Sequence, residues 1–155
     1  MAHAHRDPDQ TPGTCRTTRG AGFERLNLPA RPEWLRGIRD DLRRWAVGAA
    51  LAPEEIEVVV LCTDEALSNA VEHAYVGSDG TLDISAVRCD DPFEVTAKVT
   101  DHGHWRAPRS EAGFGGRGLA IIRRLADRVD VSTDPHGTTI QMTWSRHASP
   151  SRAEA

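Results

Sequence analysis

The chain has 155 residues, 27% of them charged, and a formal net charge of −4 at pH 7. This length fits one domain built around a single core. The slightly acidic balance argues against a general nucleic-acid binder, whose surface is usually strongly basic. No stretch approaches the roughly 20 apolar residues that span a bilayer, and residues 1–15 lack the apolar run of a secretory signal.

The cysteines and the two ends of the chain add to this picture. Cys15, Cys62 and Cys89 are odd in number, and their spacing fits no metal site. Together with the missing signal, they indicate a reducing, cytoplasmic setting. Residues 1–20 and 147–155 have almost nothing to bury, so we expect disordered tails on either side of a domain at 21–146.

The first elements expected along the chain are a strand and two helices. Residues 23–28 (FERLNL) alternate apolar and polar residues, as a half-buried strand does. Pro32 suits the first turn of a helix that runs to about residue 50. A second helix starts at Pro53, where two glutamates suit the helix dipole, and runs to about Tyr75. The expected apolar face of the first helix comprises Trp34, Leu35, Ile38, Leu42 and Trp45.

The next part of the chain predicts a hairpin and a loop. After a turn at 77–80, residues 81–89 and 93–101 alternate as two strands joined by Asp-Asp-Pro. Residues 102–116 show no periodicity, and their length favours a mobile functional loop.

The chain ends with a third helix and two strands, expected at 118–127, 129–133 and 138–144. Helices are thus grouped against an apparently antiparallel sheet. This order predicts an α+β fold: a two-layer α/β sandwich whose sheet is mixed and mainly antiparallel, with the helices on one face.

The second helix carries a polar stripe, because Glu65, Asn69 and His73 follow one another at four-residue intervals. An ionised Glu65 could take a proton from a hydroxyl or a water. The amide oxygen of Asn69 is a hard ligand that suits Mg²⁺. Taken alone the stripe is weak evidence, since the same spacing often arises on a solvated face.

A strand ends in Asp-x-Gly at Asp101 and Gly103. The carboxylate could accept a hydrogen bond from an exocyclic amine such as that of adenine, or the three residues could form an ordinary Asx turn. Thr138 follows a glycine at the start of a strand. Its hydroxyl could bind a base or a water, but threonine is also a common strand residue.

A glycine-rich stretch, GFGGRGL at 113–119, leads directly into a helix. Converging backbone N–H groups and the helix dipole would suit a phosphate there, and Arg106, Arg109 and Arg117 could add contacts. The stretch matches neither a Walker A loop nor the dinucleotide fingerprint. It could equally be a flexible connection.

These stretches follow the order of the boxes of the histidine-kinase-like ATPase superfamily. Glu-x-x-x-Asn on a helix, Asp-x-Gly after a strand, Gly-x-Gly-Leu opening a helix and Gly-Thr on a strand each resemble one box. More narrowly, EALSNAVEHAY, DHGHWRAP and GGRGLAIIRRLADRVDV are similar to the bacterial anti-sigma-factor serine/threonine kinases. The resemblance covers about residues 23–145. It implies the histidine-kinase-like ATPase fold, with a nucleotide pocket between the helices and the sheet.

The resemblance also implies roles for matching residues. Asn69 matches the family's Mg²⁺ ligand, and Glu65 the carboxylate that activates the acceptor hydroxyl. Asp101, with Gly103 beside it, matches the acid that reads the adenine amine. Thr138 would support the adenine through its hydroxyl, directly or by way of a water. The residues expected along the nucleotide phosphates are Gly116, Arg117, Gly118 and Leu119.

Two features depart from the pattern or have no assigned chemistry. Trp105 stands where many members have a second glycine, and the lid is short, which affects the expected lid conformation and phosphate contacts. His73 also recurs in this group, and we interpret it as a satisfied structural histidine.

The implied function is an ATP- and Mg²⁺-dependent kinase that phosphorylates a serine or threonine of an anti-anti-sigma antagonist and sequesters a sigma factor. Family members are often homodimers, and no direct contact with nucleic acid or membrane is expected. Two alternatives remain open: an ATP-binding partner switch without kinase activity, and an ATPase in which Glu65 activates water. A sensor histidine kinase fits poorly, because no dimerisation helices with a phosphoacceptor histidine precede the domain. The candidate partner surface, which could equally be a plain solvated face, comprises Arg36, Arg39, Arg43 and Arg44.

Overall fold

The computed structural model describes residues 17–75, 79–103 and 117–146. The elements follow in the predicted order of strands and helices. They are β1 (Thr17–Pro29), α1 (Pro32–Gly48), α2 (Pro53–His73), β2 (Thr81–Asp90), β3 (Phe93–Asp101), α3 (Arg117–Leu125), β4 (Arg128–Asp134) and β5 (Gly137–Ser145).

The predicted N-terminal tail is too long, because β1 already begins at Thr17 and pairs there with Cys89 of β2. The other residues of the two predicted tails, 1–16 and 147–155, lie outside the described residues. The same holds for most of the predicted loop, at 104–116.

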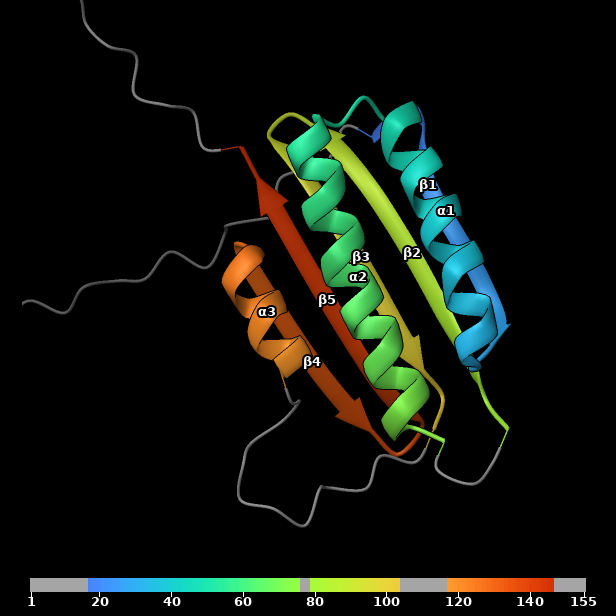
Figure 1. The fold of residues 1–155 in the computed structure, drawn as a ribbon. Coiled ribbons are helices and arrows are strands. Elements are labelled where there is room, and N and C mark those ends of the chain that lie inside the picture. The colour runs from blue at the N-terminus through green and yellow to red at the C-terminus, as the bar shows by residue number, and fades with distance from the viewer. Residues whose placement is uncertain (1–16, 76–78, 104–116, 147–155) are drawn as a thin grey trace, which may run out of the picture.

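The five strands form one sheet in the order β1-β2-β3-β5-β4, and each of its four pairings is antiparallel. The α+β two-layer fold is therefore confirmed, although the sheet described here contains no parallel pair and is not mixed. All three helices lie on the same face of the sheet (Figure 1), with α2 between α1 and α3. β2 pairs with β3 and β4 pairs with β5, because each of these pairs is joined by a short turn, and short turns join antiparallel neighbours.

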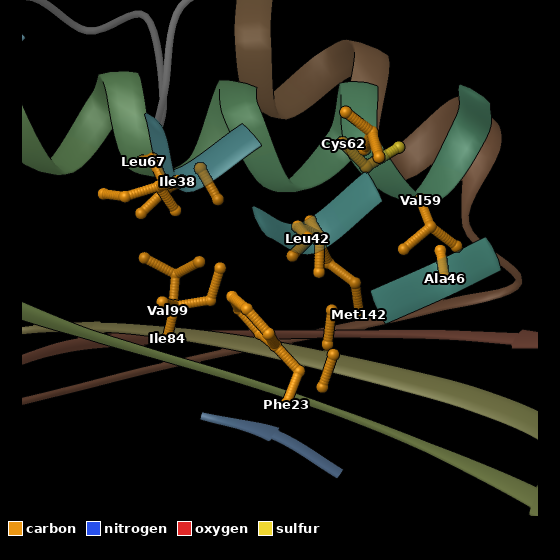
Figure 2. Close-up of a cluster of buried hydrophobic side chains, with 14 of the residues drawn as sticks. Phe23, Ile38, Leu42, Ala46, Val59, Cys62, Leu67, Ile84, Val99 and Met142 are labelled. Carbon is orange, nitrogen blue, oxygen red and sulfur yellow. The ribbon is translucent and has the colours of Figure 1, made fainter. Parts of the chain in front are cut away.

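The core fills the space between the helices and the sheet. Side chains of α1 and α2 point toward those of the strands, with Phe23 reaching up from β1 (Figure 2). Trp34 is an exception to the predicted apolar face of α1, since it is 49% exposed, while Ala46 completes the buried face instead. The largest fully buried aliphatic side chains are Leu42, Leu67, Leu82, Ile84, Ile122 and Met142.

The register of the sheet sets the position of the candidate residues. Asp101, the last residue of β3, pairs with Leu82 of β2 on one side and with Thr138 of β5 on the other. Successive strand residues point to opposite faces, and Asp101 shares its face with the buried Val99 and Ala97. Its carboxyl group therefore points to the helical layer.

The cysteines differ from the sequence interpretation. Cys62 is free and buried in α2, and burial raises the pKa of its thiol to about 11. Cys89, in contrast, is disulfide-bonded, which the odd and scattered cysteines did not predict. Within the part of the chain that the structure describes, no helix is both long and apolar enough to cross a membrane.

Candidate functional site

Glu65 and Asn69 lie one turn apart on α2 and face the first turn of α3. A Cβ atom added at Gly118 would lie 2.7 Å from Oε2 of Glu65, 3.1 Å from Nδ2 of Asn69 and 3.4 Å from Oδ1 of Asn69. Both polar side chains are half-buried. These two residues of the stripe therefore form a wall beside the start of α3 and do not belong to a plain solvated face.

Asp101 is buried at the end of β3, with 6% of its surface exposed. Its Oδ1 atom accepts hydrogen bonds from the backbone N–H groups of Gly103, at 3.1 Å, and Thr138, at 3.3 Å. Burial raises the pKa of Asp101 above its ordinary value, and these two hydrogen bonds oppose that rise. The bond from Gly103 is the one an Asx turn would make, yet the carboxyl group is inside the molecule.

Glycines bring backbone segments into close contact around Asp101. A Cβ atom at Gly103 would lie 2.3 Å from the carbonyl oxygen of Ala74, so the turn after β3 packs directly on the end of α2. Gly137 has φ +144°, and a Cβ atom there would lie 1.8 Å from the carbonyl oxygen of Asp101. Gly137 therefore meets both a steric and a conformational requirement for glycine.

Thr138 supplies an unpaired polar atom beside Asp101. The residue is 8% exposed, and its Oγ1 atom is buried without a hydrogen-bond partner among the described residues. A buried hydroxyl without a partner is unfavourable, and such groups are normally completed by a ligand or an ordered water. This orphaned hydroxyl supports an occupant at the Asp101 end of the site.

The residues present fit a magnesium-bound adenine nucleotide. Asp101 and Thr138 supply an acceptor and a hydroxyl for a base, and the amide oxygen of Asn69 is a ligand type that Mg²⁺ accepts. The N-terminus of α3 has no acidic residue in its first turn, and Arg117 there is exposed. That end of α3 consequently carries the partial positive charge that favours an anionic group.

The remaining residues that the sequence singled out are buried, exposed or outside the described part of the chain. Leu119 is buried and belongs to the hydrophobic core cluster. His73 was expected to be a satisfied structural histidine, but its side chain is 59% exposed and its Nε2 atom lies 3.8 Å from the Glu72 carboxylate. Outside the described residues lie Trp105, Arg106, Arg109 and Gly116.

The candidate partner surface on α1 is a row of four arginines, and most of them form ion pairs within the molecule. Arg39 forms an ion pair with Asp64 at 3.0 Å. Arg43 binds the carboxylate of Glu57 with two nitrogens, and Arg44 pairs with Asp41 on its own helix. Among the described residues Arg36 has no such partner. These pairs agree with the solvated-face interpretation of this row.

The sequence analysis did not identify Tyr75 as a residue that holds the backbone beside Asp101. Its hydroxyl donates a hydrogen bond to the carbonyl oxygen of Thr81 and accepts one from the backbone N–H of His102, at 2.7 Å. In the sequence Tyr75 appeared only as the last residue of a helix. No local pattern reveals these bonds, because they join three segments that only the fold brings together.

The fold and this site define a two-layer ATPase-type domain with helices on one face of an antiparallel sheet. Residues 28–144 match the family model of the histidine kinase-like ATPase domain. The chain belongs to this family. Membership supports ATP binding, and it agrees with the fit between the site residues and an adenine nucleotide.

Individual relatives show which members of the family this chain resembles. The serine-protein kinase RsbW of Bacillus pumilus is 31% identical over 134 residues, which are 76% of this chain and 82% of the relative. A crystal structure of the RsbU and RsbW domains of a Mycobacterium tuberculosis protein matches with a TM-score of 0.63 and 27% identity. The match covers 82% of this chain and 33% of that one, so this chain spans about a third of that protein's crystallised length.

A more distant structure supports the fold alone. The histidine kinase domain of a blue-light activated histidine kinase from Erythrobacter litoralis matches with a TM-score of 0.55 and 17% identity. The match covers 73% of this chain and 59% of the chain in that structure. The chain therefore shares its two-layer architecture with that domain.

Proposed function

We propose that the protein is an ATP- and Mg²⁺-dependent serine/threonine protein kinase that acts as an anti-sigma factor. It phosphorylates an anti-anti-sigma antagonist protein and sequesters a sigma factor. The observation that carries the proposal is the contact of Gly118 with both Glu65 and Asn69, which joins a carboxylate, an amide and a helix N-terminus in one place. The similarity to proteins named serine-protein kinase RsbW supports the kinase class.

The base-binding end of the site consists of Asp101, Gly103 and Thr138. Two backbone N–H groups orient the Asp101 carboxylate through Oδ1, and in the proposal this carboxylate accepts a hydrogen bond from the adenine amino group. The Thr138 hydroxyl, which has no partner among the described residues, supports the base directly or through a water. Gly103 keeps the turn close to α2, because a Cβ atom there would lie 2.3 Å from the carbonyl oxygen of Ala74.

The phosphate end of the site consists of residues on α2 and α3. Asn69 would hold Mg²⁺ through its amide oxygen, while Arg117 and the N–H groups at the start of α3 would neutralise phosphate charge. When bound, ATP supplies the transferable phosphoryl group. Glu65 would accept the proton of the substrate hydroxyl. Catalysis of this kind depends mainly on positioning and charge neutralisation, and these residues supply both.

The proposed regulation follows from the phosphorylation state of the antagonist. Unphosphorylated antagonist holds the kinase, and phosphorylated antagonist releases it to bind a sigma factor. The proposal places this exchange in the cytoplasm and includes a homodimer. Sedimentation at several protein concentrations, with and without ADP, tests the dimer.

The central experiment incubates the protein with labelled ATP, Mg²⁺ and candidate antagonist proteins. We expect label on a serine or threonine of the antagonist, and loss of that label in Glu65→Gln. Glu72→Gln is the matched control, because Glu72 lies on the same helix but is exposed, and among the described residues its ion pair is with His73 at 3.8 Å. The control should transfer phosphate at the wild-type rate.

The same assay separates the alternatives. Antagonist binding without label transfer would support a partner switch that lacks kinase activity. Release of free phosphate alone, lost in Glu65→Gln, would support an ATPase in which Glu65 activates water. Absence of any adenine nucleotide binding, measured by calorimetry with Mg²⁺, would overturn the whole proposal.

A further inference from the structure

The hydroxyl group of Tyr75 joins three segments at the base end of the site. It donates to the carbonyl oxygen of Thr81, at the start of β2, and accepts from the backbone N–H of His102, directly after β3. Tyr75 itself lies two residues past the end of α2. A hydroxyl has one proton to donate and lone pairs to accept, so a single oxygen can hold both neighbours at once.

The bond to His102 lies next to the bond that orients Asp101. The N–H of His102 is held by Tyr75, and the next N–H, that of Gly103, is held by Oδ1 of Asp101 at 3.1 Å. Two consecutive peptide groups of this turn thus bind side chains. If the first bond is lost, the His102 N–H group has no partner and the Gly103 N–H group is less firmly placed against the carboxylate.

Packing fixes the position of the Tyr75 ring. A Cβ atom at Gly80 would lie only 1.9 Å from Cε1 of Tyr75, so the ring lies directly on the Gly80 backbone. The turn itself packs on the neighbouring residue, because a Cβ atom at Gly103 would lie 2.3 Å from the Ala74 carbonyl oxygen. The ring has no room to shift toward Gly80, and its hydroxyl is held at the turn.

We infer that Tyr75 is a positioning residue for base recognition: its hydroxyl holds the turn after β3 and thereby sets the orientation of the Asp101 carboxylate toward adenine. The inference rests on the proposed adenine-nucleotide function. It goes beyond that function by assigning part of the base selectivity to a residue whose hydroxyl binds the backbone of Thr81 and His102.

A second anchor keeps the turn folded without Tyr75. The Nε2 atom of His102 lies 2.8 Å from Oδ2 of Asp83, and Oδ1 of Asp83 accepts a hydrogen bond from the backbone N–H of Asn27 at 2.7 Å. Removing the Tyr75 hydroxyl therefore leaves the His102 side chain attached to the sheet. The expected effect is a loss of local orientation and not a loss of fold.

The test compares the binding of ADP and GDP, each with Mg²⁺, by titration calorimetry. In Tyr75→Phe we expect the Kd for ADP to rise about three- to tenfold, the range that one hydrogen bond supplies, with little change for GDP. The preference for ADP over GDP therefore falls. A purely structural role would weaken both nucleotides equally and leave the preference unchanged.

Two further variants make the result decisive. Gly80→Ala keeps the hydroxyl but displaces the ring, so it should lower the same preference and serves if Tyr75→Phe does not fold. Thr100→Val is the matched control. It removes a hydroxyl one residue before Asp101 that instead bonds Thr139 at 3.0 Å on the opposite face of β3, and it should keep the wild-type preference.

The outcomes distinguish this inference from the proposed function. If the wild-type protein prefers ADP, and both Tyr75→Phe and Gly80→Ala keep that preference within twofold, the inference is wrong and the proposed function stands. If the wild-type protein binds neither nucleotide, both are overturned.

Discussion

Gly118 lies directly against the carboxylate of Glu65, with 2.7 Å between Oε2 of Glu65 and the position of a Cβ atom at residue 118. The two residues are far apart in sequence, and they meet because α3 packs beside α2 over the sheet (Figure 1). The start of α3 therefore limits where the Glu65 carboxylate can lie. This relationship makes Gly118 a sensitive position for the proposed reaction.

Gly118→Ala should displace the Glu65 carboxylate, which is the free end of a flexible side chain, while the fold persists. Misplacement of a catalytic group by about 1 Å lowers rates by roughly 10- to 100-fold, so we expect a loss of this size in phosphate transfer to the antagonist. Single-turnover transfer at saturating ATP measures it. A variant that transfers at the wild-type rate would contradict the proposed position of Glu65.

The control for that substitution is Gly37→Ala on α1. A Cβ atom at Gly37 has no neighbour within 4 Å, and the residue is exposed in a helix. Alanine should stabilise the protein by about 0.5–1 kcal/mol, because glycine loses more backbone freedom on folding. Transfer activity should not change.

Asp101→Asn should weaken ADP binding by about 10- to 100-fold, since a hydrogen bond to a charged group contributes about 1.5–3 kcal/mol. Asparagine retains an oxygen for the N–H groups of Gly103 and Thr138, so the turn should persist. Calorimetry with ADP and Mg²⁺ measures the loss. Equal affinities of the variant and the wild type would exclude Asp101 as the base acceptor.

The same variant should change the pH dependence of stability. Burial raises the pKa of Asp101 in the folded state above the ordinary value of 3.8, so the folded protein holds this proton to a higher pH than the unfolded chain does. The resulting stabilisation is complete below the unfolded pKa and is lost as the pH rises through the folded pKa. Asp101→Asn removes this dependence. Its Tm relative to the wild type should therefore rise as the pH increases from about 4 to 7, an interval that begins near the ordinary aspartate pKa.

Thr138→Val should separate ligand binding from stability. The Oγ1 atom is buried without a partner among the described residues, and valine has a similar shape and suits a strand. We expect the free protein to be as stable as the wild type or about 1 kcal/mol more stable, with ADP affinity reduced severalfold. Thermal unfolding with and without ADP measures both effects.

Thr143→Val is the matched control for that experiment. Thr143 is a buried threonine of the same strand, but its hydroxyl faces the other side of the sheet, 3.5 Å from that of Thr96. The control should bind ADP as the wild type does. A loss of affinity in both variants would indicate a general effect on β5.

Gly137→Ala should destabilise the fold itself. The residue has φ +144°, which is costly for alanine, and the added Cβ atom would lie 1.8 Å from the Asp101 carbonyl oxygen. Backbone strain of this kind costs about 1–3 kcal/mol, so we expect the free energy of unfolding to fall by about 2 kcal/mol or more. Urea titration measures it. Gly48→Ala, where nothing lies within 4 Å of the added atom, should show no comparable loss.

The sequence alone determined the elements and the candidate residues at the two ends of the site. β3 occupies Phe93–Asp101 as predicted, and α2 begins at Pro53 as predicted. These features can be predicted because periodicity, proline and the helix dipole act over a few neighbouring residues. The ordered boxes also led to the family that the comparisons establish.

Only the tertiary structure decided which residues touch. It placed Gly118 against Glu65, left the Thr138 hydroxyl unpaired among the described residues and brought the Tyr75 hydroxyl to the turn after β3. It also exposed His73, which the sequence had suggested to be structural. These contacts join residues that are distant along the chain. They depend on strand order, on register and on how the helices pack, and no local pattern encodes any of these.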